Sequence, residues 1–193
     1  MKRFSIKRFG YYLLYVLSIH VVALFFFFAF RFTLFCSIDY QFPADIEGDF
    51  ALKAVAFVRG LWFDNVIACY ILLLPLVVMW IAALFDYTAK WLFRSVAVYF
   101  ILFYSVSFII AAANIPYFEY FFKTINSSIY NWFGYGGTTA GMVFGESSYY
   151  FPIFLGLLSI ILFGWGALYL SAYFYRRSMA TAPRISWKSR LAI

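Results

Sequence analysis

The chain has 193 residues, of which 66% are hydrophobic and only 12% are charged. A soluble globular domain has about half of its residues apolar and about a quarter charged, so this composition excludes an ordinary soluble domain and a disordered chain. The net charge of +7 comes from 15 Lys and Arg residues against 8 Asp and Glu residues. In so apolar a chain we interpret these cations as orienting it in a membrane, and we expect no nucleic-acid partner.

Four stretches are long and apolar enough to cross a bilayer, because a helix needs about 20 residues to cross a hydrocarbon core of roughly 30 Å. The predicted spans are residues 10–30, 65–85, 93–115 and 149–173. Backbone groups in lipid must be hydrogen-bonded within the segment, so each span is expected to be a helix. The sequence therefore predicts an all-α fold, a polytopic helical membrane protein with one membrane domain over residues 1–193.

Three prolines fall at informative places in these stretches. Pro75 lies inside the second span, where it removes a backbone hydrogen bond and is expected to kink the helix. Pro116 is expected to end the third span. Pro152 falls in the first turn of the fourth span, where proline is best tolerated.

The charges predict the orientation of the spans. Most of the Lys and Arg residues precede the first span, lie between the second and third, or follow the fourth, while nearly all the acids lie in the other connections. By the positive-inside rule, both termini are expected in the cytoplasm.

Both connections on the predicted outer side are expected to be structured. Residues 49–64 are predicted to form an amphipathic helix with a narrow polar stripe that includes Asp49 and Lys53, and such a helix is expected to lie in the outer membrane interface. Residues 114–148 are predicted to form an outer loop that begins with an aromatic-rich stretch and continues into a glycine-rich one.

Arg31 stands at the end of the first span. Its long side chain is expected to extend to the interface. The alternatives are a contact with a lipid headgroup or an ion pair with Asp64 at the start of the second span.

Arg59 and Asp64 flank residues 60–63. Asp64 is expected to cap the second span, where an acid also complements the helix dipole. The functional alternative is a polar site at the outer surface that holds a phospholipid headgroup, with Arg59 as the ligand of the anion.

Glu119 and Lys123 are four residues apart with the acid first, so on a helix they can form an ion pair. The alternative is that both belong to the same outer lipid-headgroup site.

The remaining reactive residues predict little chemistry. His20 is alone in the first span, with no acid in any predicted span, so we expect it to hydrogen-bond a neighbouring helix and not to relay protons. Cys36 and Cys69 are interpreted as small apolar residues, or as a disulfide only if both face an oxidising side. We expect no metal site, no cofactor and no catalytic residue in this chain.

Three segments together carry a family resemblance: AFVRGLWFD at 56–64, NVIACYILLLP at 65–75 and ANIPYFEYFFK at 113–123. In this order and spacing they resemble the membrane-embedded N-terminal half of the lipoteichoic acid synthase-like phosphoglycerol transferases. That family belongs to the sulfatase and alkaline phosphatase superfamily, and the similarity is to versions from Bacteroides-type bacteria. The family often has Arg where this chain has Trp62.

The resemblance implies a five-helix membrane domain in the bacterial cytoplasmic membrane, followed by a large extracytoplasmic catalytic domain. In the family, a metal-bound Thr takes a phosphoglycerol-type group from a membrane lipid. The nucleophile, the ligands of the divalent metal and the fifth helix would all lie beyond Ile193, so no catalytic or metal-binding residue is carried over.

The expected function is therefore the membrane-anchoring and lipid-access module of a phosphoglycerol-transferase- or sulfatase-like cell-envelope enzyme, as a fragment without the catalytic domain. Its expected partners are membrane lipids and a separately encoded or missing extracytoplasmic catalytic domain. The cationic residues 176–190 followed by apolar residues are typical of the start of a further span. The alternative is a free-standing small membrane protein that acts as a partner subunit or a transporter-like scaffold.

Overall fold

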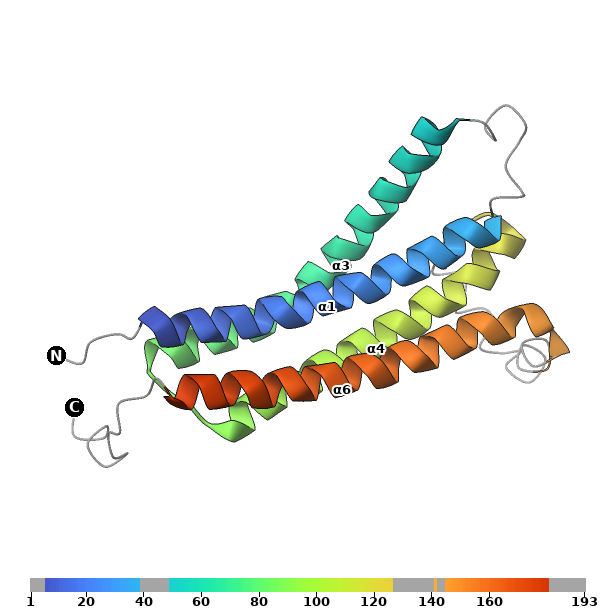
Figure 1. Cartoon of the computed structure of the whole chain (residues 1–193). Coiled ribbons are helices and arrows are strands. Elements are labelled where there is room, and N and C mark those ends of the chain that lie inside the picture. Colours follow the sequence, from blue (N-terminus) through green and yellow to red (C-terminus); the bar gives the residue numbers. More distant parts are fainter. Residues whose placement is uncertain (1–5, 39–48, 127–140, 142–144, 181–193) are drawn as a thin grey trace, which may run out of the picture.

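The computed structural model describes residues 6–38, 49–126, 141 and 145–180 (Figure 1). Its elements are α1 (Ile6–Ile38), α3 (Phe50–Leu84), α4 (Lys90–Phe121), the short 3-10 helix η3 (Ser147–Tyr149) and α6 (Tyr150–Ala180). The four α-helices are long and apolar enough to cross a membrane. The described residues contain no strand, and the all-α prediction is confirmed.

α1 lies in the middle of the bundle and packs on α3 at one side and on α4 and α6 at the other (Figure 1). The first residues of α1, the last residues of α6 and the turn between α3 and α4 lie at the same end. The outer half of α3 diverges from the other three helices (Figure 1). α3 is therefore attached to the bundle mainly through α1.

The contact between α1, α4 and α6 is largely aromatic. The rings of Phe108 and Phe163 meet edge to face with centroids 5.4 Å apart, and Tyr104 meets Phe163 at 5.1 Å. Phe27 of α1 packs edge-on against Phe108 at 5.4 Å. Such pairs contribute about 0.5–1.5 kcal/mol each beyond area burial. Because helices in lipid gain little from the hydrophobic effect, close packing of this kind holds them together.

Gly156 brings α6 close to α4. A Cβ atom placed on Gly156 would lie 3.1 Å from the Cβ atom of Ala112, which is tighter than nine in ten real contacts of this type. Gly164 and Gly166 have no comparably close neighbour. Gly156 is thus the glycine of the fourth span that permits close helix packing.

α1 is fastened to the turn between α3 and α4 at the end where the chain begins. The Tyr12 hydroxyl donates to the carbonyl oxygen of Tyr87 at 2.8 Å and lies 2.7 Å from the Thr88 hydroxyl. Arg8 is buried and forms an ion pair with Asp86, whose backbone is left-handed with φ of 53°. These contacts set how α1 and α3 meet at this end.

α3 is one uninterrupted helix of 35 residues. The segment 49–64 is helical as predicted, but it continues directly into the second span. The helix begins after Asp49, whose carboxylate accepts the Leu52 N–H at 3.0 Å. Asp64 lies inside the helix, so the prediction that Asp64 caps the second span is wrong. The physical reason is that nothing between residues 50 and 74 breaks the helix, and Pro75 is accommodated within it.

α4 also extends further than the sequence suggested. It continues through Pro116 and ends at Phe121, where Phe122 adopts φ of 52° and donates its N–H to the Phe118 carbonyl at 2.8 Å. The prediction that Pro116 ends this helix is wrong. Proline removes one backbone hydrogen bond, and this loss is tolerated near a helix end when the surrounding turn stays packed. The neighbouring residue Ile115 is buried. The start of the predicted outer loop, residues 114–121, is therefore helical.

Parts of the sequence predictions fall outside the described residues. These include the glycine-rich stretch of the predicted outer loop at 134–139 and the cationic residues from 181 onward. Cys36 and Cys69 are both free, so the alternative of a disulfide between them is not realised.

Candidate lipid site between α1 and α3

Arg31 of α1 and Asp64 of α3 form a two-pronged ion pair. The Arg31 Nε–H donates to Asp64 Oδ2 at 3.1 Å, and Nη2 donates to Oδ1 at 2.8 Å. The exposed fractions of the two side chains are 22% and 14%. Paired guanidinium–carboxylate hydrogen bonds are among the stronger and more directional contacts in proteins. The ion-pair alternative for Arg31 is confirmed.

Gly60 makes room for the Arg31 side chain. A Cβ atom on Gly60 would lie 2.8 Å from Arg31 Nε and 2.9 Å from Cζ. Gly60 stands one helical turn before Asp64, on the same face of α3. The sequence Gly-x-x-x-Asp therefore places a gap beside a carboxylate, and the guanidinium lies in that gap.

A crevice of about 530 Å³ lies between α1 and the outer half of α3. Its walls are apolar except for two polar side chains of α3, Asp64 and Asn65. The lining residues are Val21, Leu24, Phe25, Phe27, Phe28, Val58, Leu61, Trp62, Asp64 and Asn65. An apolar hollow with a few convergent polar groups is the usual form of a ligand site.

The two halves of α3 are held very differently. The buried residues of α3 all lie in its second half, from Ala68 to Ala83, and the Tyr104 hydroxyl donates to the Ala68 carbonyl at 3.4 Å. None of the described side chains in residues 50–67 is buried. This half meets α1 through the Arg31–Asp64 pair, the approach of Gly60 to Arg31, and Phe57, whose ring lies 5.6 Å from that of Phe28. The outer half of α3 thus contacts α1 along one half-buried face.

A second polar contact joins the same two helices. The His20 side chain lies near Asn65 of α3, and Asn65 Oδ1 accepts a weak contact from Cys69 Sγ at 3.9 Å. The expectation that His20 hydrogen-bonds a neighbouring helix stays a prediction, because its Nδ1 is buried without a hydrogen-bond partner among the described residues. The expectation that no acid lies within a span needs correction, because Asp64 is an interior residue of α3.

Arg59 is not part of this arrangement. It is exposed and does not line the crevice. Arg59 precedes Asp64 by five residues, which on an α-helix turns the two side chains roughly 140° apart. The predicted site with Arg59 and Asp64 on one face therefore does not form around the crevice.

Glu119 and Lys123 lie at the far end of α4. Lys123 follows the end of the helix at Phe121, so the helical spacing that would pair it with Glu119 is not completed. Glu119 lies near Tyr149 of η3, because the two side chains interact electrostatically. Glu119 therefore lies at the end of α4 that is near η3, whereas Arg31 and Asp64 join α1 to α3.

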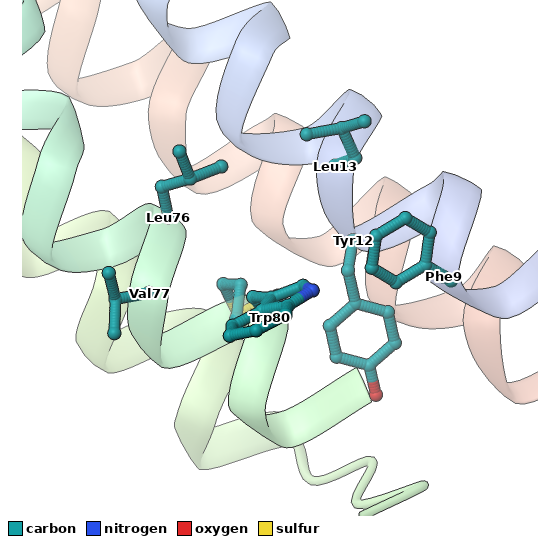
Figure 2. A pocket seen from close by; sticks show the side chains of 7 residues that line it. Phe9, Tyr12, Leu13, Leu76, Val77 and Trp80 are labelled. Carbon is teal, nitrogen blue, oxygen red and sulfur yellow. The ribbon is translucent and has the colours of Figure 1, made fainter. Parts of the chain in front are cut away.

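The structure also shows a second, smaller hollow that the sequence did not indicate. It measures about 280 Å³ and lies between α1 and the second half of α3. Figure 2 shows its walls, which α1 and α3 both contribute. The lining residues are Phe9, Tyr12, Leu13, Leu76, Val77, Met79 and Trp80. Apolar residues inside apolar spans carry no signal of such a hollow.

Within residues 6–38, 49–126, 141 and 145–180, no group of three or more His, Cys, Asp or Glu side chains could hold a metal ion. The arrangement of the described residues instead offers an apolar groove with one paired cation and anion. Chemically, such a site can hold an amphiphile.

Four apolar helices of membrane-spanning length, with most of their apolar side chains turned outward, define a multi-pass helical membrane protein. No family model, no curated protein and no solved structure matches the chain.

Proposed function

We propose that the chain is the membrane-anchoring and lipid-access module of a phosphoglycerol-transferase- or sulfatase-like cell-envelope enzyme. The observation that carries this proposal is the crevice between α1 and α3, with the Arg31–Asp64 pair beside its apolar walls. A lipid has the same division into an apolar tail and a charged head. The proposal also draws on the family resemblance of residues 56–75 and 113–123.

The location of the proposed module is the bacterial cytoplasmic membrane. Arg8, Lys90, Arg94 and Arg177 lie at the end of the bundle that holds the start of α1 and the end of α6. This supports a cytoplasmic position for that end by the positive-inside rule. The opposite end, with the outer half of α3, would then face the side where an extracytoplasmic catalytic domain acts.

The module would supply anchoring and lipid delivery, while a partner domain would supply the chemistry. That domain would hold the divalent metal and the nucleophile. The proposal therefore predicts no phosphoglycerol transfer by this chain alone.

The test is lipid retention by the purified full chain, measured by native mass spectrometry after detergent extraction. Leu61→Trp adds bulk inside the crevice and is expected to remove most of the retained lipid. Leu102→Trp, on the exposed face of α4, is the matched control and is expected to retain lipid like the unmodified chain. Equal retention by the two variants would contradict lipid access through this crevice.

A second candidate is a free-standing partner subunit or transporter-like scaffold. The polar side chains of His20, Asp64 and Asn65 between α1 and α3 favour it, because polar groups inside spans often line a pathway. Proton flux into vesicles that contain the purified chain, lost in His20→Leu, would support this candidate over the first.

A further inference from the structure

We propose that Asp64 is the specificity-determining residue of the lipid site, and that it selects lipids whose headgroup carries neighbouring hydroxyl groups. The hydroxyl groups would donate hydrogen bonds to the Asp64 carboxylate while the Arg31–Asp64 pair stays closed. The headgroup class is a polyol, as in a phosphoglycerol lipid or in a neutral sugar lipid. This inference rests on the proposed lipid-access function and assigns the specificity of its site.

The polar part of the crevice offers more hydrogen-bond acceptors than donors. Asp64 and Asn65 are the polar side chains of its lining, and Arg31, although it pairs with Asp64, does not belong to the lining. A carboxylate is an acceptor only, and an asparagine amide adds one more acceptor oxygen and one NH₂ donor group. A lipid in the crevice therefore meets a carboxylate, and its headgroup must bring hydrogen-bond donors to it.

Asp64 has acceptor capacity left for such donors. Its two oxygens each accept one hydrogen bond from Arg31, at 3.1 Å and 2.8 Å. An ionised carboxylate offers about four lone-pair sites, so about two remain. Two neighbouring hydroxyl groups match these remaining sites, because they stand on adjacent carbon atoms and both can point to the same carboxylate.

The charge balance favours a neutral donor at this point. Arg31 already compensates the charge of Asp64, whose side chain is only 14% exposed. A hydroxyl group leaves this balance unchanged. A cationic donor would add a second positive charge beside one carboxylate, and uncompensated charge in an apolar setting is strongly unfavourable. The phosphate of a phosphoglycerol lipid would stay outside the lining, on the side of Arg31.

Binding of this kind needs no movement of α3. The outer half of α3 contacts α1 along a half-buried face that includes Gly60 and Asp64, and the Arg31 side chain lies against Gly60 on this face. The gap at Gly60 and the two-pronged contact with Arg31 hold the carboxylate in place before a lipid arrives. A site held in its bound geometry loses less conformational freedom on binding.

The test compares lipids that differ only in their hydroxyl groups. The purified full chain in detergent would be offered two matched pairs of lipids with identical acyl chains, and bound lipid would be measured by native mass spectrometry. The first pair is phosphatidylglycerol and phosphatidylmethanol, which share the charge of the phosphate. The second pair is glucosyl diacylglycerol and its O-methylated form, which are both uncharged.

We expect the hydroxyl-bearing member of at least one pair to be retained roughly tenfold more than its partner, as for one hydrogen bond to a charged group. A preference in the first pair alone assigns a phosphoglycerol lipid, and a preference in the second pair alone assigns a neutral sugar lipid. A preference in both pairs assigns polyol headgroups in general.

Two variants show whether the preference depends on Asp64. The double variant Arg31→Gln with Asp64→Asn is expected to lose the preference, because it removes the carboxylate and leaves no unpaired charge that would unfold the protein. Arg59→Gln is the matched control, because Arg59 is an exposed cation of the same helix that does not line the crevice. The control is expected to keep the preference.

Equal retention within both pairs by the unmodified chain would overturn the assignment, as would an unchanged preference in the double variant or a lost preference in Arg59→Gln. Lipid access itself stands in each case if the Leu61→Trp variant still loses its bound lipid. Equal retention within both pairs, together with lipid retained by Leu61→Trp, would overturn both proposals.

Discussion

Arg31 and Asp64 are charged residues held largely away from solvent, and each depends on the other. Their forked contact places two hydrogen bonds across the α1–α3 interface. Removing one partner leaves a charge in an apolar setting, whereas removing both leaves none. The individual residues of this site should therefore behave as a unit.

A double-mutant cycle tests that dependence. Arg31→Gln alone and Asp64→Asn alone are each expected to lower the free energy of unfolding by about 2–4 kcal/mol, and the double variant by less than the sum of the two losses. The measurement is denaturant unfolding in detergent micelles, followed by circular dichroism. Strictly additive losses would show that the two side chains are not coupled.

Gly60 is the second residue on which the site depends. Gly60→Ala places a methyl group against the Arg31 guanidinium and is expected to cost about 1–2 kcal/mol of stability, despite the better helix propensity of alanine. Gly166→Ala is the matched control, because nothing lies within 4 Å of the added Cβ. The control is expected to be neutral or stabilising, and the same result for Gly60→Ala would show that Arg31 does not need the gap.

At the scale of elements, α4 and α6 pack closely against each other, whereas the outer half of α3 has no buried side chain. The α4–α6 contact is formed by edge-to-face aromatic pairs and by the close approach at Gly156. The outer half of α3 meets α1 along one half-buried face that includes the ion pair.

Overpacking the α4–α6 contact should expose this difference. Gly156→Leu is expected to destabilise the protein by about 1–3 kcal/mol, because its side chain would overlap Ala112. Leu157→Ile, a neighbouring change on α6 at a position that is 58% exposed, is the control and is expected to change stability by less than about 0.5 kcal/mol. Thermal unfolding in detergent distinguishes the two, and equal midpoints would contradict close packing at Gly156.

For the whole molecule, the open question of orientation has a direct test. Lys90 and Lys123 are both exposed and lie at opposite ends of α4. In a chain with Cys36→Ala and Cys69→Ala, we expect Lys123→Cys to react with a membrane-impermeant maleimide in intact cells. Lys90→Cys is expected to react only after the membrane is permeabilised. The reverse pattern would place the crevice at the cytoplasmic end and contradict the proposed function.

Much of the fold was predictable from local sequence. The four spans follow from hydropathy, which depends only on the side chains within each segment. Pro116 and Asp64 show the limit of that reasoning. Proline and acid are common at helix ends, but each is tolerated inside a helix when tertiary contacts compensate, as the Arg31 pair does for Asp64.

Of the candidate site residues, the sequence identified Arg31 and Asp64 but could not choose among their partners. They are 33 residues apart on different helices, and their meeting depends on how α1 and α3 are rotated against each other. Arg59, Glu119 and Lys123 look equally suitable in the sequence. In the structure, the rotation of α3 turns Arg59 away from Asp64. The end of α4 at Phe121 leaves Glu119 and Lys123 away from the Arg31–Asp64 pair.

The sequence by itself determined that this is a helical membrane protein with four apolar segments and an uneven distribution of charge. The tertiary structure decided that the segment before the second span belongs to the same helix, and that this helix leaves a crevice beside α1. The physical reason is that hydropathy is a property of each segment alone, whereas a crevice and an ion pair depend on the packing of side chains from two segments. The aromatic contacts of α1 with α4 and α6, together with Gly60 under Arg31, set that packing.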